Sequence, residues 1–269
     1  MLPWKEPRRL LHLSRNVLVA VWIVLACPLL AWTASPDQDR EVDLQAIFSG
    51  GVPTSVAELR AMEQHQQQLA TELLESTVGI VVGPAHGSGV IIGEDGYVLT
   101  AAHVAGEPGR RATIILADGR QLKGKTLGVF RTLDAGLVKI TSEGSWHHSE
   151  LSPHPEVKRG QWVIATGHPG GVQAGRRPAL RVGRILMVDG FAITTDCTLI
   201  GGDSGGPLFD MQGRVIGVNS RIGRSLDANL HVPVAAYQNH WERLARGDSW
   251  GHFPGTGPYL GVEGTGDPN

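Results

Sequence analysis

Three short stretches of the chain carry side chains that could together cleave a peptide bond. Ser204 lies among glycines in GGDSGGPLFD (201–210), His103 follows an apolar run in LTAAHV (99–104), and Asp134 precedes one in LDAGLVKI (133–140). A serine becomes a nucleophile when a nearby histidine takes its proton, and that histidine needs a group to orient it. We therefore predict that Ser204, His103 and Asp134 form a catalytic triad.

The order of the three residues along the chain is informative. His103 precedes Asp134, which precedes Ser204. This is the order of chymotrypsin-like enzymes rather than of subtilisins or α/β-hydrolases. The three residues are too far apart in sequence to be local neighbours, so distant elements must bring them together. Each residue taken singly has a commoner role in a loop or turn, and the catalytic interpretation depends on their occurring together.

Short β-branched runs separated by Gly and Asp-Gly turns are the elements that must position these residues. One group of runs lies within 77–140 and a second within 161–233, with an irregular stretch at 141–160 between them. Such a pattern is typical of barrels or a sandwich. The division into two groups favours an all-β fold of two barrels, with the active site in the cleft between them.

Helical patterns flank these strands. Ser55 and Glu58 have capping-box spacing, and apolar residues then recur at three- and four-residue intervals as far as Leu73. This N-terminal helix is predicted to pack on its own domain, with self-association as the alternative. Residues 37–76 are thus a linker, at 37–53, followed by an amphipathic helix. Residues 234–247 predict one short closing helix that ends at Gly247.

The first 36 residues have the layout of an export signal. Four basic residues within the first 15 precede an uncharged apolar stretch, which predicts a signal peptide or signal anchor over 1–36. Trp32 stands where a cleavage site needs a small residue, and this favours an uncleaved anchor. We expect a protein of the cell envelope, periplasmic or membrane-anchored. The net charge of −2 gives no indication of nucleic-acid binding.

Three longer segments resemble the trypsin-like serine proteases, and within them the HtrA/Deg family. They are GSGVIIGEDGYVLTAAHV (87–104), ATGHPGG (165–171) and TDCTLIGGDSGGPLFDMQGRVIGVNS (195–220). The resemblance covers residues 77–246, the predicted protease domain. It implies two six-stranded antiparallel β-barrels and a serine endopeptidase that acts on unfolded or damaged polypeptides. It also implies a homotrimer formed through the segment before the protease domain.

The same resemblance assigns further residues to the site. The backbone N–H groups of Gly202 and Ser204 would form the oxyanion hole, which stabilises negative charge on the substrate carbonyl oxygen. The primary specificity pocket would have Thr198 at its base, and its other lining residues would be Leu199, Ile200, Val218, Asn219 and Ser220. An uncharged base predicts cleavage after small or medium aliphatic residues rather than after Lys or Arg.

Two departures from the family pattern bear on function. HtrA members often carry Asn where Asp203 stands, and in relatives activated by cleavage this Asp pairs with a newly cut N-terminus. The IVVG stretch at 80–83 lies too close to His103 to be such an N-terminus, so no activation cleavage is expected. Residues 247–269 form a tail in which GPYLGVEG (257–264) resembles the opening of a PDZ domain but is too short to fold.

Two other functions are alternatives to a general protease. The chain could be a protease-like binding module without activity, or a protease that processes or senses one partner. No His, Cys or carboxylate cluster has metal-ligand spacing, so neither a metal nor a cofactor is expected. Cys197 is predicted to be a free thiol. The histidines without a supporting motif, predicted to be surface or loop residues, are His147, His148, His154 and His168.

Overall fold

Strands dominate the protein, whose computed structural model describes residues 42–153, 156–223 and 228–256. The predicted export signal at 1–36, the PDZ-like segment at 257–264 and His154 lie outside the described residues. Within the described ranges, no helix is long and apolar enough to cross a membrane.

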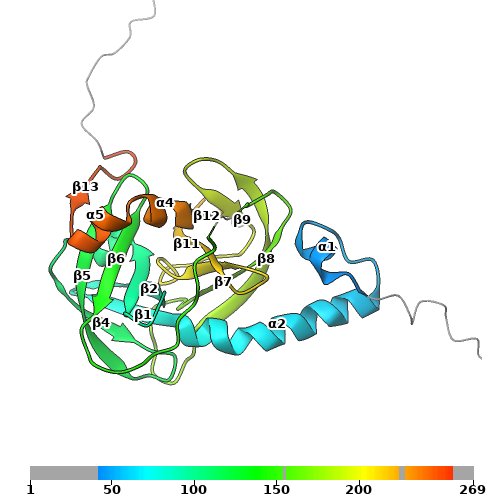
Figure 1. Ribbon diagram of the computed structural model, residues 1–269, viewed down its shortest axis with the longest axis horizontal. Helices are drawn as coiled ribbons and strands as arrows, with labels where there is room; N and C mark the ends of the chain where they lie inside the picture. Colours follow the sequence, from blue (N-terminus) through cyan, green and yellow to red (C-terminus); the bar gives the residue numbers. More distant parts are fainter. Residues whose placement is uncertain (1–41, 154–155, 224–227, 257–269) are drawn as a thin grey trace, which may run out of the picture. The chain divides into compact units, whose positions relative to one another are not determined.

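The first barrel is built from six antiparallel strands. They are β1 (Thr77–Val82), β2 (Ala85–Ile91), β3 (Tyr97–Ala101), β4 (Arg111–Ile115), β5 (Gln121–Phe130) and β6 (Ala135–Ile140). Their order is β5-β4-β1-β2-β3-β6, and a β5–β6 pairing closes the barrel (Figure 1). Alternate residues of β1, namely Val78, Ile80 and Val82, are buried in its core, as the two-residue period of a strand requires. The short strand β13 (Ser249–Trp250) adds to β5 in parallel.

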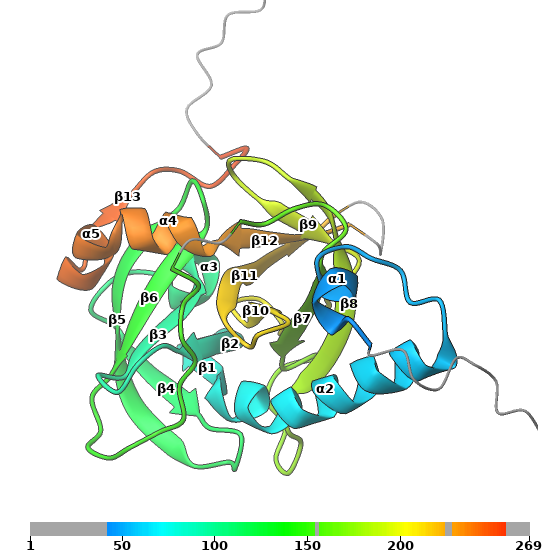
Figure 2. The same ribbon diagram turned by 45° about the vertical axis from the view of Figure 1, so that its right-hand side comes forward.

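The second barrel also has six antiparallel strands and is closed. It contains β7 (Trp162–Gly167), β8 (Ala179–Val188), β9 (Ile193–Thr195), β10 (Pro207–Asp210), β11 (Val215–Ile222) and β12 (Asn229–Pro233). Their order around the barrel is β10-β11-β12-β9-β8-β7. Figures 1 and 2 show the two barrels side by side. The predicted all-β fold of two six-stranded barrels is confirmed.

Five helices surround the barrels in the described part of the chain. They are α1 (Leu44–Phe48), α2 (Val56–Ser76), α3 (Ala102–Ala105), α4 (Val234–Asn239) and α5 (Trp241–Arg246). The predicted capping box is present, since Ser55 accepts from the Glu58 N–H and Glu58 accepts from the Ser55 N–H. Helix α1 differs from the linker expected there, because Ile47 and Phe48 are buried. The predicted closing helix is divided, since His240 leaves the helical conformation at φ −121° and ψ 17°.

Helix α2 joins the two barrels (Figure 2). It ends at Ser76, and the chain continues without a loop into β1 at Thr77. The Thr77 hydroxyl donates to the Leu73 carbonyl at 2.7 Å and lies 2.6 Å from the hydroxyl of Thr166 on β7. The Ser76 hydroxyl lies 2.7 Å from that of Ser149, and both pairs of hydroxyls are buried. This junction therefore contacts the first barrel, the second barrel and the stretch that links them.

Candidate active site

His103 and Asp134 lie on neighbouring elements of the first barrel. His103 is in α3, directly after β3, and Asp134 directly precedes β6; the pairing of β3 with β6 therefore brings the two together. The His103 Nδ1 lies 2.9 Å from Oδ2 and 3.0 Å from Oδ1 of Asp134. The backbone N–H of His103 also donates to Oδ1, at 3.0 Å. Because the carboxylate engages Nδ1, the imidazole is oriented with Nε2 available for a proton.

Asp134 has a strained backbone. Its φ of +62° makes it the one non-glycine residue with positive φ in the described chain. Asp tolerates this region better than most residues, at a cost of about 1–3 kcal/mol. The carbonyl of Asp134 accepts from the Ala102 N–H at 2.9 Å, which holds this conformation. The buried carboxylate gains a further donor in the hydroxyl of Ser220, 2.6 Å from Oδ2.

Ser204 belongs to the second barrel and is bonded to both barrels. Its carbonyl accepts from the Ser88 N–H of β2 at 2.8 Å, across the junction between the barrels. Its hydroxyl donates to the carbonyl of Ser220 at 3.4 Å, the long limit of a hydrogen bond. Within the described chain the hydroxyl makes no hydrogen bond to His103. Ser220 thus connects Ser204 to Asp134 and His103, and the three predicted triad residues lie in one bonded chain.

Two free backbone N–H groups lie beside Ser204. Those of Gly202 and of Ser204 itself donate to no acceptor among the described residues, whereas those of Asp203, Gly205 and Gly206 donate to carbonyls at 3.1, 2.7 and 2.9 Å. Gly202 has a φ of +97°, and a Cβ there would lie 2.3 Å from a backbone oxygen, so no other residue fits. Two free donors only two residues apart are the kind of groups that can stabilise a developing negative charge.

A hollow of about 290 Å³ opens beside Ser204. Thr198, predicted at the pocket base, is exposed and does not line it, and neither do Val218 and Asn219, which are buried in β11. Of the predicted pocket residues, Leu199, Ile200 and Ser220 do line it. The complete lining is Leu199, Ile200, Gly201, Ser204, Ser220, Arg221 and Ile222.

Asn219 holds the backbone behind the nucleophile. Its side-chain amide donates to the carbonyls of Thr166 and Asp203, at 2.9 and 3.2 Å, and its amide oxygen lies 2.9 Å from Nδ1 of His231. The other nitrogen of His231 lies 2.7 Å from the Thr195 hydroxyl. Burial lowers the pKa of His231 to about 3, so the ring is neutral and can accept from one partner while it donates to the other.

His168 is a loop residue, as predicted, but it is not a surface residue. It directly follows β7 and is buried, and its backbone N–H donates to the hydroxyl of Ser88 at 2.9 Å. That hydroxyl in turn donates to the carbonyl of Gly202 at 2.8 Å. Burial, together with the charge of Arg176, lowers the pKa of His168 to about 4. His147, by contrast, is exposed.

The other reactive groups of the described chain do not form a second centre. No group of three or more His, Cys, Asp or Glu residues there could hold a metal ion. Cys197 is free, as predicted, and buried. Burial raises the pKa of its thiol to about 11, which leaves it protonated at neutral pH.

The part of the chain that carries the candidate triad matches a known protein family. Residues 87–218 match a family model described as a trypsin-like peptidase domain. The matched range contains His103, Asp134 and Ser204 and extends over parts of both barrels. The matched range and the two-barrel fold make the chain similar to the trypsin-like serine peptidases.

Two similar proteins make this resemblance more specific. A probable periplasmic serine endoprotease DegP-like from Halomonas elongata is 38% identical over 156 residues, which are 55% of this chain and 32% of that protein. The putative serine protease HhoB from Synechocystis sp. is 35% identical over 190 residues, 65% of this chain and 43% of that protein. The chain spans less than half the length of these two relatives. The chain is therefore similar to DegP-like members of the trypsin-like serine proteases over its matched part.

Solved structures show the same fold. The crystal structure of Deg5 superposes with a TM-score of 0.59 at 24% identity, covering 70% of this chain and 97% of that one. The HtrA-type protease AlgW with tripeptide gives a TM-score of 0.57 at 23% identity, covering 65% of this chain and 62% of that one.

Proposed function

We propose that the chain is an exported serine endopeptidase that hydrolyses peptide bonds through His103, Asp134 and Ser204. One observation carries the proposal: His103 contacts both carboxylate oxygens of Asp134 through Nδ1, and Ser204 lies beside two free N–H groups in the same bonded chain. A proton on Nδ1 leaves Nε2 as the base, which is the tautomer that serine catalysis needs.

The reaction follows from these contacts. The Ser204 hydroxyl turns from the Ser220 carbonyl towards His103, gives its proton to Nε2 and attacks the scissile carbonyl carbon. The carbonyl oxygen becomes negative and accepts from the N–H groups of Gly202 and Ser204. The proton on His103 then passes to the leaving amine, and the peptide C–N bond breaks. Water, deprotonated by the same histidine, attacks the acyl carbon; the bond from that carbon to Oγ of Ser204 then breaks, and Oγ takes the proton back from His103.

The hollow beside Ser204 supports a preference for aliphatic side chains. Leu199, Ile200 and Ile222 give it apolar walls, no carboxylate is among its lining residues, and Arg221 adds positive charge. We expect faster cleavage of a peptide library after Val, Ala or Leu than after Lys or Arg. Faster cleavage after a basic residue would contradict this assignment of the pocket.

Substrate and location rest on the relatives and on the sequence. An extended, unfolded polypeptide can pair with a strand edge beside the nucleophile, which supports unfolded proteins as substrates. The name "periplasmic" in relatives and the predicted export signal at 1–36 support action outside the cytoplasm. A survey of cleaved proteins separates this role from the processing of one partner, which would give a single sharp product.

The start of α2 and the segment just before it support self-association. Val52, Val56 and Leu59 are 64%, 63% and 54% exposed, although Met62 and Leu73 farther along the helix are buried. We propose that this apolar surface joins copies of the chain, as trimers of the family do. Light scattering of the chain should give a mass above the monomer, and Leu59→Ser should lower it; a monomeric wild type would exclude the idea.

One observation favours the alternative of an inactive binding module: the Ser204 hydroxyl is bonded to Ser220 rather than to His103. Labelling of the purified full chain with a fluorophosphonate probe decides between the two functions. Labelling that is lost in Ser204→Ala and His103→Ala, and kept in His147→Ala, supports the protease. A wild type that remains unlabelled supports the binding module.

A further inference from the structure

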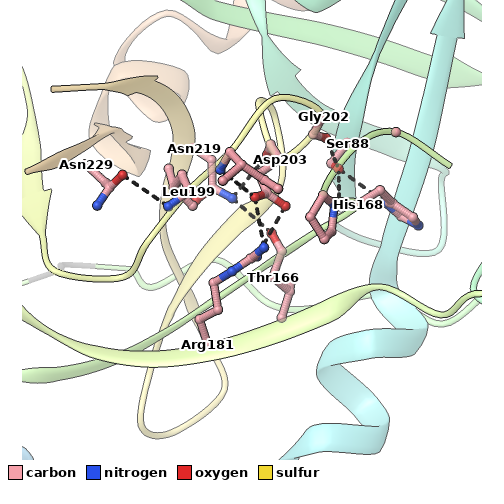
Figure 3. Close-up of polar contacts among 12 residues, drawn as sticks. Ser88, Thr166, His168, Arg181, Leu199, Gly202, Asp203, Asn219 and Asn229 are labelled. Carbon is pink, nitrogen blue, oxygen red and sulfur yellow. Dashed lines mark hydrogen bonds and ion pairs between the residues drawn. The ribbon is translucent and has the colours of Figure 1, made fainter. Parts of the chain in front are cut away.

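A buried ion pair joins strand β8 to the nucleophile loop, defined here as residues 200–206 (Figure 3). Arg181, on β8, approaches Asp203 with both terminal nitrogens. Nη2 lies 3.0 Å from Oδ2, and Nη1 donates to Oδ1 at 3.2 Å. The Asp203 side chain is fully buried and that of Arg181 is 20% exposed. Two parallel contacts between a guanidinium and a carboxylate hold both the position and the plane of the carboxylate.

Asp203 stands between Gly202 and Ser204, the two residues of the loop whose backbone N–H groups donate to no acceptor in the described chain. The peptide that links Asp203 to Ser204 carries one of these N–H groups, so the orientation of Asp203 sets its direction. The Asp203 carboxylate also accepts from the Ile200 N–H at 2.9 Å, which closes the nucleophile loop on itself. Ser88 holds the Gly202 carbonyl at 2.8 Å, and Figure 3 shows these contacts converging on the loop.

The carboxylate needs a cation because it is removed from water. Burial raises the pKa of Asp203, and the Ile200 N–H and the charge of Arg181 act against that rise. A buried carboxylate without a partner is strongly unfavourable. It would take up a proton or turn towards water. Either change would release Ile200 or rotate the peptide that carries the Ser204 N–H.

The chain's IVVG stretch cannot supply this cation. Ile80 and Val81 lie inside β1, where Ile80 is paired with Gly87 on one side and with Ile114 on the other. A newly cut N-terminus there would have to leave the centre of the first barrel. Arg181 needs no such change, since the pairing of β8 with β7 places it opposite Ala165, beside the loop.

We propose that Arg181 is a positioning residue: it is a resident counter-ion that holds the nucleophile loop with its oxyanion donors free, so that folding alone, without cleavage of the chain, produces a competent site. The inference rests on the proposed peptidase function. It gives a residue of β8 a role in catalysis, although that residue belongs neither to the proposed triad nor to the lining of the hollow.

The test is the second-order rate constant for fluorophosphonate labelling of the full chain. We expect Arg181→Met to lower it by about 100-fold, the effect of losing one oxyanion donor. Arg184→Met is the matched control, because Arg184 lies on the same strand but contacts the carbonyls of Gly50 and Gly160 instead. It should stay within about threefold of wild type. The intact mass of the labelled wild type should be that of the uncut chain plus the probe less HF, since the serine oxygen displaces fluoride from phosphorus.

A double variant separates the loop from a general loss of stability. Arg181→Met with Asp203→Asn removes both charges and leaves an amide oxygen for Ile200, so it should label at least about tenfold faster than Arg181→Met alone. The His103 Nδ1 proton should keep its downfield NMR signal in both variants, since the Asp134 contact is not touched. Should Arg181→Met fail to fold, the folded double variant carries the test.

The outcomes distinguish the two proposals. If the wild type is labelled and Arg181→Met is labelled at the same rate, the role of Arg181 is overturned and the proposed peptidase function stands. A double variant that folds but labels as slowly as Arg181→Met, or labelling found only on a cut chain, also overturns it. A wild type that is not labelled at all overturns the proposed function, and the role of Arg181 with it.

Discussion

Asp134→Asn is the substitution that tests the candidate triad most directly. The amide is nearly the same size as the carboxylate and still offers an oxygen to the N–H groups of His103. Its NH₂ group can donate to the hydroxyl of Ser220, which then reverses its role. The fold should therefore persist, and the change removes chiefly the negative charge beside the imidazole.

The structure sets the size of the effect. When His103 takes the proton of Ser204 it becomes positive, with Nδ1 2.9 Å from Oδ2 of Asp134. Two unit charges at this separation attract by about 6 kcal/mol at an effective dielectric constant of about 20. Loss of that attraction in the transition state slows the reaction by about 10⁴-fold.

Fluorophosphonate labelling is again the suitable assay, because it requires the same proton transfer and no knowledge of the natural substrate. Asp118→Asn, in an exposed turn, is the matched control and should label like the wild type. Circular dichroism should show that the Asp134→Asn protein is folded. A folded Asp134→Asn protein that labels within about tenfold of wild type would refute the reasoning, since His103 would then work without its orienting charge.

Three further predictions concern stability and reactivity. Gly205→Ala would place a Cβ 2.1 Å from a backbone oxygen of β2, so urea unfolding should show a free energy of unfolding lower by about 3 kcal/mol or more. Gly119→Ala, at the same φ of +88° but in open space, should lower it by only about 1 kcal/mol. Equal losses would contradict the packing argument. His231 is neutral when folded, with a pKa of about 3 against 6.5 in the unfolded chain. Below pH about 6.5 the unfolded state therefore binds the extra proton, and His231 alone should lower the free energy of unfolding by up to about 1.4 kcal/mol for each pH unit towards pH 3. His168, with a folded pKa of about 4, adds to this fall; His231→Gln should reduce the slope and His147→Gln should not. Cys197 should not react with iodoacetamide at about pH 8 in the native protein and should react in urea; rapid native reaction would mean that the second barrel opens.

The strands, and the placement of His103 beside Asp134, could be predicted because their signals are local. His103 and Asp134 stand next to β-branched runs, and barrel closure then places them together. The capping box could also be predicted, because Ser55 and Glu58 are only three residues apart. The division of the closing helix at His240 could not, since no breaker residue marks it and tertiary packing decides the backbone there.

Contacts between distant strands were the part that sequence reasoning missed. Arg181 carries one signal: it occupies alternate positions of β8 with Gly183 and Ile185, which are buried. An arginine on an inward face requires a buried anion. Which anion it meets depends on barrel closure, and so does the burial of His168. Asn219 and His231 offer no sequence signal, because their bonds depend on the register of β11 with β12.

The junction of α2 with β1 also has a consequence for how the protein folds. The hydroxyls of Ser76 and Thr77 find their buried partners, Ser149 and Thr166, only when both barrels are in place. A chain with one barrel folded would leave buried hydroxyls without partners, each costing about 1–3 kcal/mol. The barrels should therefore melt as a single cooperative unit, and partly folded chains with a half-built catalytic centre should be scarce. For an enzyme proposed to destroy unfolded proteins, such cooperativity also shortens the time during which its own copies resemble substrate.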